Sequence, residues 1–508
     1  MKNGAETGKA KSGRYAAVGI LAVLALAVAL RAPFLQERTF FIDEAFSYVL
    51  AGHSAGEVLA GSASESNPPL PVLLFHAWQL WAGREWELRL LSVLLSLAAV
   101  AGVYAFGAGM GGRRAGLIAG LITAASVYQV NLAQVYRYPA LAVFVATGCF
   151  HFYWRWLDRG RARDLWLAAL FFALGLYTHY FFIFVVLSAN LFAVGCFAKR
   201  PRRLLHWFVS QLAVAAAFAP WLLVFVGQSG GELAPVGVEA LARHLKTFPF
   251  LTVPNVLQAF CFGDHAMQGR AGLLALGALV YALLFLRLLA HHDPLKKWFL
   301  IVNIFAGLGL PWVMMLLLGL RLQLMYFCVF SCLLYVAFGL VLGGGGGSKQ
   351  LRSVTGAALA ALMVFSLVFH YTNLPADEDN KTIIKYIEQN AAPADVVVLN
   401  PTYQGWLFEY YARRDLRLFG IPKQFDVLNY NFGDVEQVTA ERLDEMDRLV
   451  QPGGRVWGFF GFGTKTKPDQ GELTIKHLRE NYRLVEERRF TPVSFALDAG
   501  LLAVYEKR

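Results

Sequence analysis

Long apolar stretches recur along the chain from the N-terminus to about residue 371. A helix needs about twenty mostly apolar residues to cross the hydrocarbon core of a bilayer, and eleven stretches meet or approach that length. They predict membrane-spanning helices at 15–34, 87–107, 115–132, 138–157, 164–178, 181–198, 206–227, 271–290, 298–319, 323–343 and 352–371. The pattern therefore predicts an all-α polytopic membrane bundle over residues 1–374.

The pattern changes after residue 371. Amphipathic helical segments there alternate with β-branched runs, and Pro and Gly mark the joints. The segments "GRVWGFFGFG" and "VSFALDAGLLAVYEK" are typical of strands. We therefore expect a small soluble α/β domain at 375–508. A first outer loop at 35–86 is expected to carry surface helices, because "AFSYVLAGHSAGEVLAG" is amphipathic.

The positive charges indicate which side each loop occupies. With a cytoplasmic N-terminus, the cytoplasmic segments hold 19 lysines and arginines, whereas the longer outer connections hold about nine. This asymmetry follows the positive-inside rule, so it accounts for most of the net charge of +11 and argues against nucleic-acid binding. An odd number of spans places the C-terminal domain outside. Arg31 and Pro33 follow the first apolar stretch in place of small residues, which predicts an uncleaved helix rather than a signal peptide.

Composition supports the membrane interpretation and excludes some other classes. Hydrophobic residues make up 57% of the chain and charged residues only 16%, whereas soluble domains carry about a quarter charged residues. The five cysteines are scattered and form no CxxC or Cys/His spacing. A disulfide framework or a zinc site is therefore not indicated.

Unusual polar residues collect on the predicted outer face. Asp43 and Glu44 stand side by side in "TFFIDEAFSYVLA", just beyond the first span. Arg89, Arg137 and Arg321 lie at predicted helix ends, where each by itself is typical of interfacial anchoring. A lone ionisable group at membrane depth costs about 2.5–3.5 kcal/mol on insertion scales. Several on one face therefore indicate a shared polar cavity in which carboxylates and guanidiniums compensate one another.

Four fragments occur in a characteristic order: "FIDEAFSYVLA", "NPPLPVLLFHAWQLWAGREWELRLLSVLLSL", "AQVYRYPALAVF" and "LYTHYFFIFVV". This order resembles the membrane glycosyltransferases of the GT-C fold. The similarity is to the bacterial branch related to protein O-mannosyltransferases and to the aminoarabinose and galacturonosyl transferases of lipid A. It covers roughly residues 15–340. Two departures are visible: Asn67 stands where the family often has histidine, and the lysine that usually precedes the prolines in the aminoarabinose branch is missing.

The resemblance implies an enzyme that moves a sugar from a polyprenyl-phosphate carrier to an acceptor hydroxyl at the outer leaflet. It implies that Asp43 and Glu44 are catalytic and that Arg137, Arg321 and Arg89 bind the donor phosphate. The substrate cavity would then include four further residues, namely Asn67, Tyr136, Tyr138 and His179. No cofactor is indicated with certainty, and acidic pairs of this kind also suit a divalent metal.

An inverting transfer is the chemistry that this residue set favours. An acceptor hydroxyl needs a base within about 3 Å, for which Asp43 is the candidate, with Glu44 positioning the acceptor. The partners would be a lipid-linked sugar donor, membrane lipid and an acceptor glycan, lipid or protein. A polytopic flippase for lipid-linked sugars and a lipid A-modifying aminosugar or uronosyl transferase stay open as alternatives. A non-catalytic scaffold would leave the acidic pair unexplained.

Overall fold

The computed structural model describes residues 2–64, 67–228, 253–263, 266–267, 269–318, 322–344, 348–373, 380–424, 426–428, 438–461, 470–490 and 500–507. The chain divides into two compact units. The first combines Met1–Pro33 with Arg89–Leu374, and the second combines Phe34–Leu88 with Pro375–Arg508. The first loop thus belongs to the same unit as the C-terminal segment, although more than 280 residues separate them in sequence.

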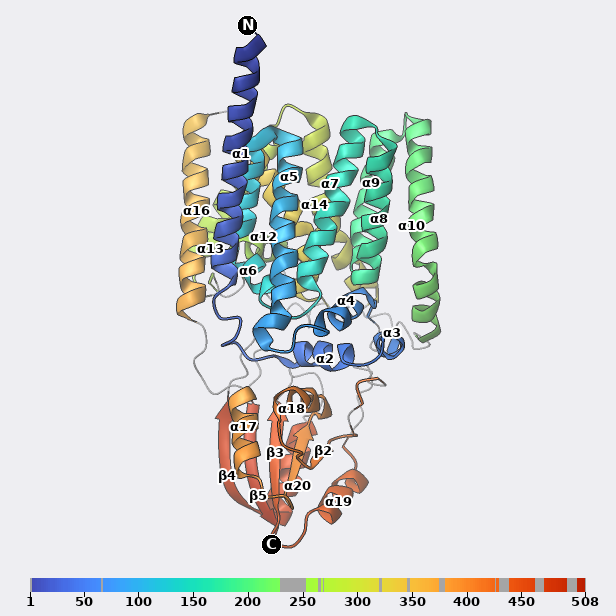
Figure 1. Cartoon of the computed structure of the whole chain (residues 1–508), viewed down its shortest axis with the longest axis vertical. Helices are drawn as coiled ribbons and strands as arrows, with labels where there is room; N and C mark the ends of the chain where they lie inside the picture. The colour runs from blue at the N-terminus through green and yellow to red at the C-terminus, as the bar shows by residue number, and fades with distance from the viewer. Residues whose placement is uncertain are drawn as a thin grey trace. The chain divides into compact units, whose positions relative to one another are not determined.

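Helices are the only regular secondary structure among the described residues of the first unit, and they run alongside one another (Figure 1). In chain order they are α1 (Lys2–Arg31), α5 (Glu85–Ala125), α6 (Val127–Ala133), α7 (Pro139–Arg159), α8 (Ala162–Thr178), α9 (Phe182–Phe197), α10 (Pro201–Gln228), α12 (Val253–Phe262), α13 (Ala271–Leu289), α14 (Pro294–Leu318), the 3₁₀ helix η2 (Leu324–Phe330), α15 (Ser331–Gly343) and α16 (Lys349–Thr372). The first residues of α5, up to Leu88, belong to the second unit.

Helices occupy each of the eleven predicted spans. Among the described helices, six are long and apolar enough to cross a membrane by length and composition. The second and third predicted spans form the two arms of α5, which bends at Gly112, where φ is +81°. Glycine adopts this left-handed region without the steric penalty that a Cβ would bring. The third span was predicted to reach residue 132 but ends at Ala125, because Ser126 is extended and its side chain accepts a hydrogen bond from the amide of Gln129 to cap α6.

One end of the first unit is held together by polar contacts. Arg31, fully buried at the end of α1, donates from Nε to Ser96 Oγ at 2.9 Å and from Nη1 to the carbonyl of Ala124 at 2.9 Å. The side chain of Gln134 donates to the carbonyls of Arg31 and Pro33 at 3.1 and 2.8 Å. These bonds fix the end of α1 to the end of α5 and to the turn that follows α6, where several predicted site residues lie.

The second unit contains a mixed sheet with helices around it (Figure 1). Its helices are α2 (Ile42–Ala51), α3 (Ala55–Ser64), α4 (Leu70–Gln79), α17 (Asn380–Asn390), the 3₁₀ turn η3 (Thr402–Gln404), α18 (Gly405–Tyr411), α19 (Ala440–Leu449) and α20 (Gln470–Asn481). Its strands are β1 (Val396–Asn400), β2 (Leu418–Gly420), β3 (Arg455–Gly461), β4 (Tyr482–Phe490) and β5 (Gly500–Lys507).

The strand order is β2-β1-β3-β5-β4, with β1 parallel to β2 and β3, and with β5 antiparallel to β3 and β4. The predicted strand "GRVWGFFGFG" appears as β3, and the terminal run appears as β5 from Gly500. Strand β4 was not predicted. Residues Val398, Phe460 and Ala503 of the sheet pack with Met446 of α19 and Leu478 of α20 in one apolar core.

The helices of the first loop pack on the C-terminal part of the same unit. Phe46 of α2 meets Trp406 of α18 edge to face, with ring centroids 4.7 Å apart, and both side chains are fully buried. Within the loop, His76 of α4 contacts the carbonyl of Ala51 at 2.9 Å. The position of α2 is therefore set by α4 and α18 together.

Candidate functional site

The structure distributes the predicted site residues over both units. Asp43, Glu44 and Asn67 lie in the second unit. The remaining described members, Arg89, Tyr136, Arg137, Tyr138 and His179, lie in the first. Arg321 lies outside the described residues. The convergence of the acids and the guanidiniums in one cavity, which involves both units, stays a prediction.

The two neighbouring acids have different environments at the start of α2. Glu44 is 1% exposed, and its Oε2 accepts a hydrogen bond from the amide of Phe41, the N-cap residue, at 3.4 Å. This bond is the acidic half of a capping box. Asp43 is half-buried instead, and its backbone carbonyl accepts from the Ser47 hydroxyl at 2.9 Å. The geometry therefore gives Glu44 a local structural partner in the first turn of α2, and Asp43 is the less buried residue of the pair.

Helix polarity adds to this arrangement. Both acids stand in the first turn of α2, where unsatisfied amides give the helix a partial positive charge that stabilises a negative one. Asn67, the third predicted residue of this unit, is half-buried just before α4. Its amide donates to the carbonyl of Ser62 at 3.1 Å, which folds the chain back on α3.

In the first unit, Tyr138 and His179 are in direct contact. Their rings stack with centroids 4.3 Å apart. The ring centroid of Tyr326, in η2, lies 4.9 Å from that of His179. The prediction grouped Tyr138 and His179 but did not include Tyr326. The signal was present, because Tyr326 follows Arg321 by five residues in the same short segment of the sequence.

His179 lies in the connection between α8 and α9 and is a neutral hydrogen-bonding group. Its Nδ1 accepts from the amide of Phe181 at 3.1 Å, so the ring proton belongs on Nε2. Desolvation by the surrounding protein, and then the charge of Arg137, lower the pKa of His179 from 6.5 to about 3. At neutral pH the ring can therefore donate from Nε2 without carrying a charge.

The two described arginines of the site occupy neighbouring parts of the first unit. Arg89 is 1% exposed in the first turns of α5. Ser92, one turn further along, donates to the carbonyl of Val135 at 2.7 Å, which fixes the turn with Tyr136 and Arg137 beside this part of α5. Tyr136 is fully buried and Arg137 half-buried. Guanidiniums so placed suit a phosphate, because they present paired donors in a rigid fork.

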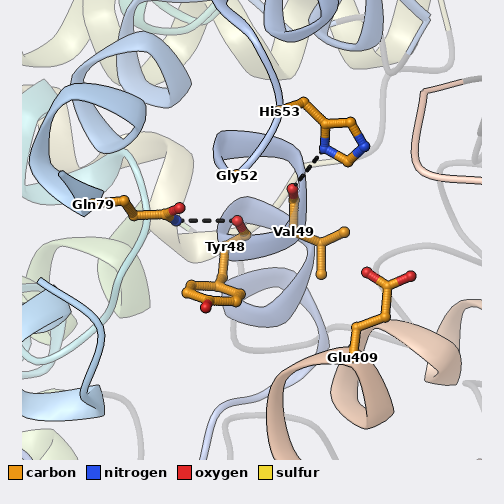
Figure 2. Close-up of a pocket in the computed structure, with 6 residues that line it drawn as sticks. All are labelled: Tyr48, Val49, Gly52, His53, Gln79 and Glu409. Atoms are coloured by element: carbon orange, nitrogen blue, oxygen red, sulfur yellow. Dashed lines mark hydrogen bonds between the residues drawn. The ribbon is translucent and has the colours of Figure 1, made fainter. Parts of the chain in front are cut away.

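A shallow pocket of about 230 Å³ lies within the second unit (Figure 2). Its walls are Tyr48, Val49, Gly52, His53, Gln79 and Glu409. Figure 2 shows the imidazole of His53 and the carboxylate of Glu409 on the same side of α2. The Glu409 side chain reaches solvent, yet its surroundings desolvate it enough to raise its pKa, while the charge of His53 acts in the opposite direction.

This pocket was not predicted as a site. Nδ1 of His53 contacts the carbonyl of Val49 at 2.9 Å, so Nε2 remains the acceptor in a neutral ring. Tyr48 and Val49 stand in the second half of α2, and Gly52 and His53 follow its end, whereas Asp43 stands in its first turn. Asp43 does not line this pocket. Glu409 gave a weak sequence signal as the one acid in the aromatic helix "GWLFEYY".

Within the part of the chain that the structure describes, no group of three or more His, Cys, Asp or Glu side chains is placed to hold a metal ion.

Comparisons with known proteins add to this geometry. Residues 66–224 match the model of the dolichyl-phosphate-mannose-protein mannosyltransferase family. The chain also resembles the crystal structure of ArnT from Cupriavidus metallidurans in the apo state, with TM-score 0.59, 13% identity, and coverage of 97% of this chain and 98% of ArnT. The same protein bound to undecaprenyl phosphate gives TM-score 0.57 and 13% identity over 96% and 98% of the two chains. A search of curated proteins finds no match.

These likenesses confirm the predicted fold class, a polytopic helical bundle of the GT-C type followed by a small α/β domain. They are consistent with a multi-pass membrane protein. The matched segment contains Asn67, Arg89, Arg137 and His179, and it begins after the acidic pair.

Replacing Glu44 tests its capping role. We expect Glu44→Ala to lower the free energy of unfolding by about 1 kcal/mol, because the Phe41 amide loses its side-chain acceptor at the helix start. Glu44→Gln keeps an acceptor and should stay close to wild type in thermal unfolding. Equal stability of all three proteins would contradict the capping assignment.

His179 makes stability depend on pH in a defined direction. Its folded pKa lies below the ordinary 6.5, so the unfolded chain binds more protons as pH falls from 6.5 toward 3, and acid favours unfolding. We expect His179→Gln to lose less thermal stability than wild type when the pH is lowered from 7 to 5. A loss as large as that of wild type would show that His179 titrates normally in the fold.

Proposed function

We propose that this protein transfers a sugar from a polyprenyl-phosphate carrier to an acceptor hydroxyl at the outer face of the cytoplasmic membrane. The observation that carries the proposal is the match of residues 66–224 to the dolichyl-phosphate-mannose-protein mannosyltransferases. The fold likeness to ArnT, over nearly all of both chains, is consistent with it. One ArnT structure contains undecaprenyl phosphate, a lipid of the class proposed here for the donor.

The proposed reaction is a single displacement at the anomeric carbon. The acceptor oxygen forms a bond to that carbon while the bond to the donor phosphate oxygen breaks, which inverts the configuration. Asp43 takes the proton of the acceptor hydroxyl as the general base. Asp43 is less buried than its neighbour Glu44, which supports this role. The capping bond of Glu44 supports a positioning role for Glu44 itself.

The leaving group is the polyprenyl phosphate, whose negative charge grows as the glycosidic bond breaks. We propose that Arg137, Arg89 and Arg321 stabilise this charge by charge-assisted hydrogen bonds. His179 would add an uncharged Nε2–H donor, which is directed by the Phe181 amide on its other nitrogen. Tyr138 stacks on the same ring and would hold its orientation.

Two further parts of the proposal concern location and acceptor. The charge asymmetry of the loops supports an N-terminus in the cytoplasm and a C-terminal domain on the outside. The family match names a mannosyl transfer to protein, and a lipid A-directed aminosugar or uronosyl transfer is the alternative within the same class.

Deleting the gene and restoring it with variants tests the function. Mass spectrometry of envelope lipids, polysaccharides and proteins should show loss of a mass equal to one hexose, pentose or uronic acid. We expect Asp43→Asn to reduce the restored product by at least a hundredfold, the scale of a lost general base. Glu37→Gln, an exposed acid six residues earlier, should restore wild-type amounts.

Full restoration by Asp43→Asn would remove Asp43 from the mechanism. An unchanged envelope after deletion, together with a defect in lipid transport, would favour the flippase over the transferase.

A further inference from the structure

The hydroxyl of Tyr411 lies between the two ends of the first loop. Tyr411 is the last residue of α18 and is 6% exposed. Its oxygen accepts a hydrogen bond from the backbone amide of Phe40 at 2.6 Å, and its O–H donates to the carboxylate of Glu85. Phe40 stands just before α2, and Glu85 is the first residue of α5. One side chain of the C-terminal segment thus contacts both ends of a loop of more than forty residues.

Glu85 has a second partner from the same segment. Nζ of Lys381, in α17, lies 2.7 Å from Glu85 Oε2. The Glu85 side chain is only 7% exposed, and a carboxylate so buried is costly unless it is paired and hydrogen-bonded. Both of these compensating groups come from the C-terminal segment, so the loop end at Glu85 is stable in this position only while that segment is docked.

Aromatic packing reinforces the same junction. The ring of Phe40 stacks on Tyr410 with centroids 4.5 Å apart, and the Tyr410 hydroxyl donates to the carbonyl of Gly83 at 3.2 Å. Tyr48 of α2 also contacts Tyr410, edge to face, at 4.6 Å. Packing holds the segments together, whereas the Tyr411 hydroxyl fixes one particular amide of the segment that leads into α2.

We infer that the C-terminal domain positions the proposed base, with Tyr411 and Lys381 as positioning residues that hold the Phe40 and Glu85 ends of the loop. Phe40 precedes Asp43 by three residues, so a displacement of the Phe40 backbone is transmitted directly to the first turn of α2. An error of about 1 Å in a reacting group lowers a rate by about a hundredfold. This inference rests on the proposed function for its catalytic consequence, but the attachment itself can be tested separately.

The attachment is tested by hydrogen exchange on the full chain in lipid nanodiscs. Tyr411→Phe keeps the ring and removes the oxygen that accepts the Phe40 amide, so exchange of that amide should accelerate by tenfold or more. Tyr482→Phe is the matched control, because it removes a Tyr–carboxylate bond of 2.7 Å to Asp447 in the same domain without touching the loop. Unchanged exchange at Phe40 in Tyr411→Phe would overturn the inference.

The catalytic consequence is tested with the same variants. Tyr411→Phe and Lys381→Met should reduce the restored envelope product by roughly ten- to a hundredfold, while the affinity of the purified protein for undecaprenyl phosphate stays at the wild-type value. Lys381→Arg retains the charge and should recover most of the product. A general loss of folding would instead lower the affinity and the product together.

The results separate the two ideas. If the Phe40 amide exchanges faster in Tyr411→Phe but this variant restores the full amount of envelope product, the positioning role is overturned and the proposed transferase function still stands. If gene deletion removes no envelope sugar, the proposed function fails, while the exchange result still decides whether the C-terminal domain holds the loop.

Discussion

The buried carboxylate of Glu85 is the constraint on which the second unit depends. Its charge is compensated by Lys381 and by the Tyr411 hydroxyl, and both come from the opposite end of the chain. Satisfying Glu85 therefore requires that the C-terminal segment fold against the first loop. Once it does, Phe46 and Trp406 are brought together and α2 acquires a fixed place in the unit. A polar requirement thus selects the docked arrangement, and apolar burial stabilises it.

The two acids in the first turn of α2, which this constraint fixes in place, have different environments. Glu44 is used at the helix start, where its bond to the Phe41 amide defines the first turn of α2. Asp43, one residue earlier, shares the favourable field of the helix N-terminus but stays partly accessible. In the first unit, the stack of Tyr138 on His179, with Arg137 nearby, supplies neutral and charged donors. The proposed transfer would take its base from the second unit and its donors from the first.

The sequence predicted the bundle well because the length of an apolar segment is a direct physical requirement of a bilayer. That Ser126 interrupts the third span was not predicted, because apolar residues continue on both sides of this serine and span length alone set the prediction. Strand β4, "YRLVEERRF", was missed because five of its nine residues are charged, which suits the edge of a sheet but hides the β pattern.

The site was predictable to the extent that it rests on residue type and order, as with the contact of Tyr138 and His179. The attachment of Phe40 to Tyr411 was not, because 371 residues separate the partners and neither forms part of a local pattern. Glu409 was overlooked for the same reason: only the fold brings it to the pocket beside His53.

The central claim is that the acid at position 43 and the guanidinium at position 137 serve one site on the outer side of the membrane. Single cysteines at these positions, Asp43→Cys and Arg137→Cys, can be introduced after the five native cysteines are replaced. A membrane-impermeant maleimide added to intact cells should label both, as it should a cysteine placed in the C-terminal domain. Labelling of one position from outside and of the other only after the membrane is opened would contradict the account.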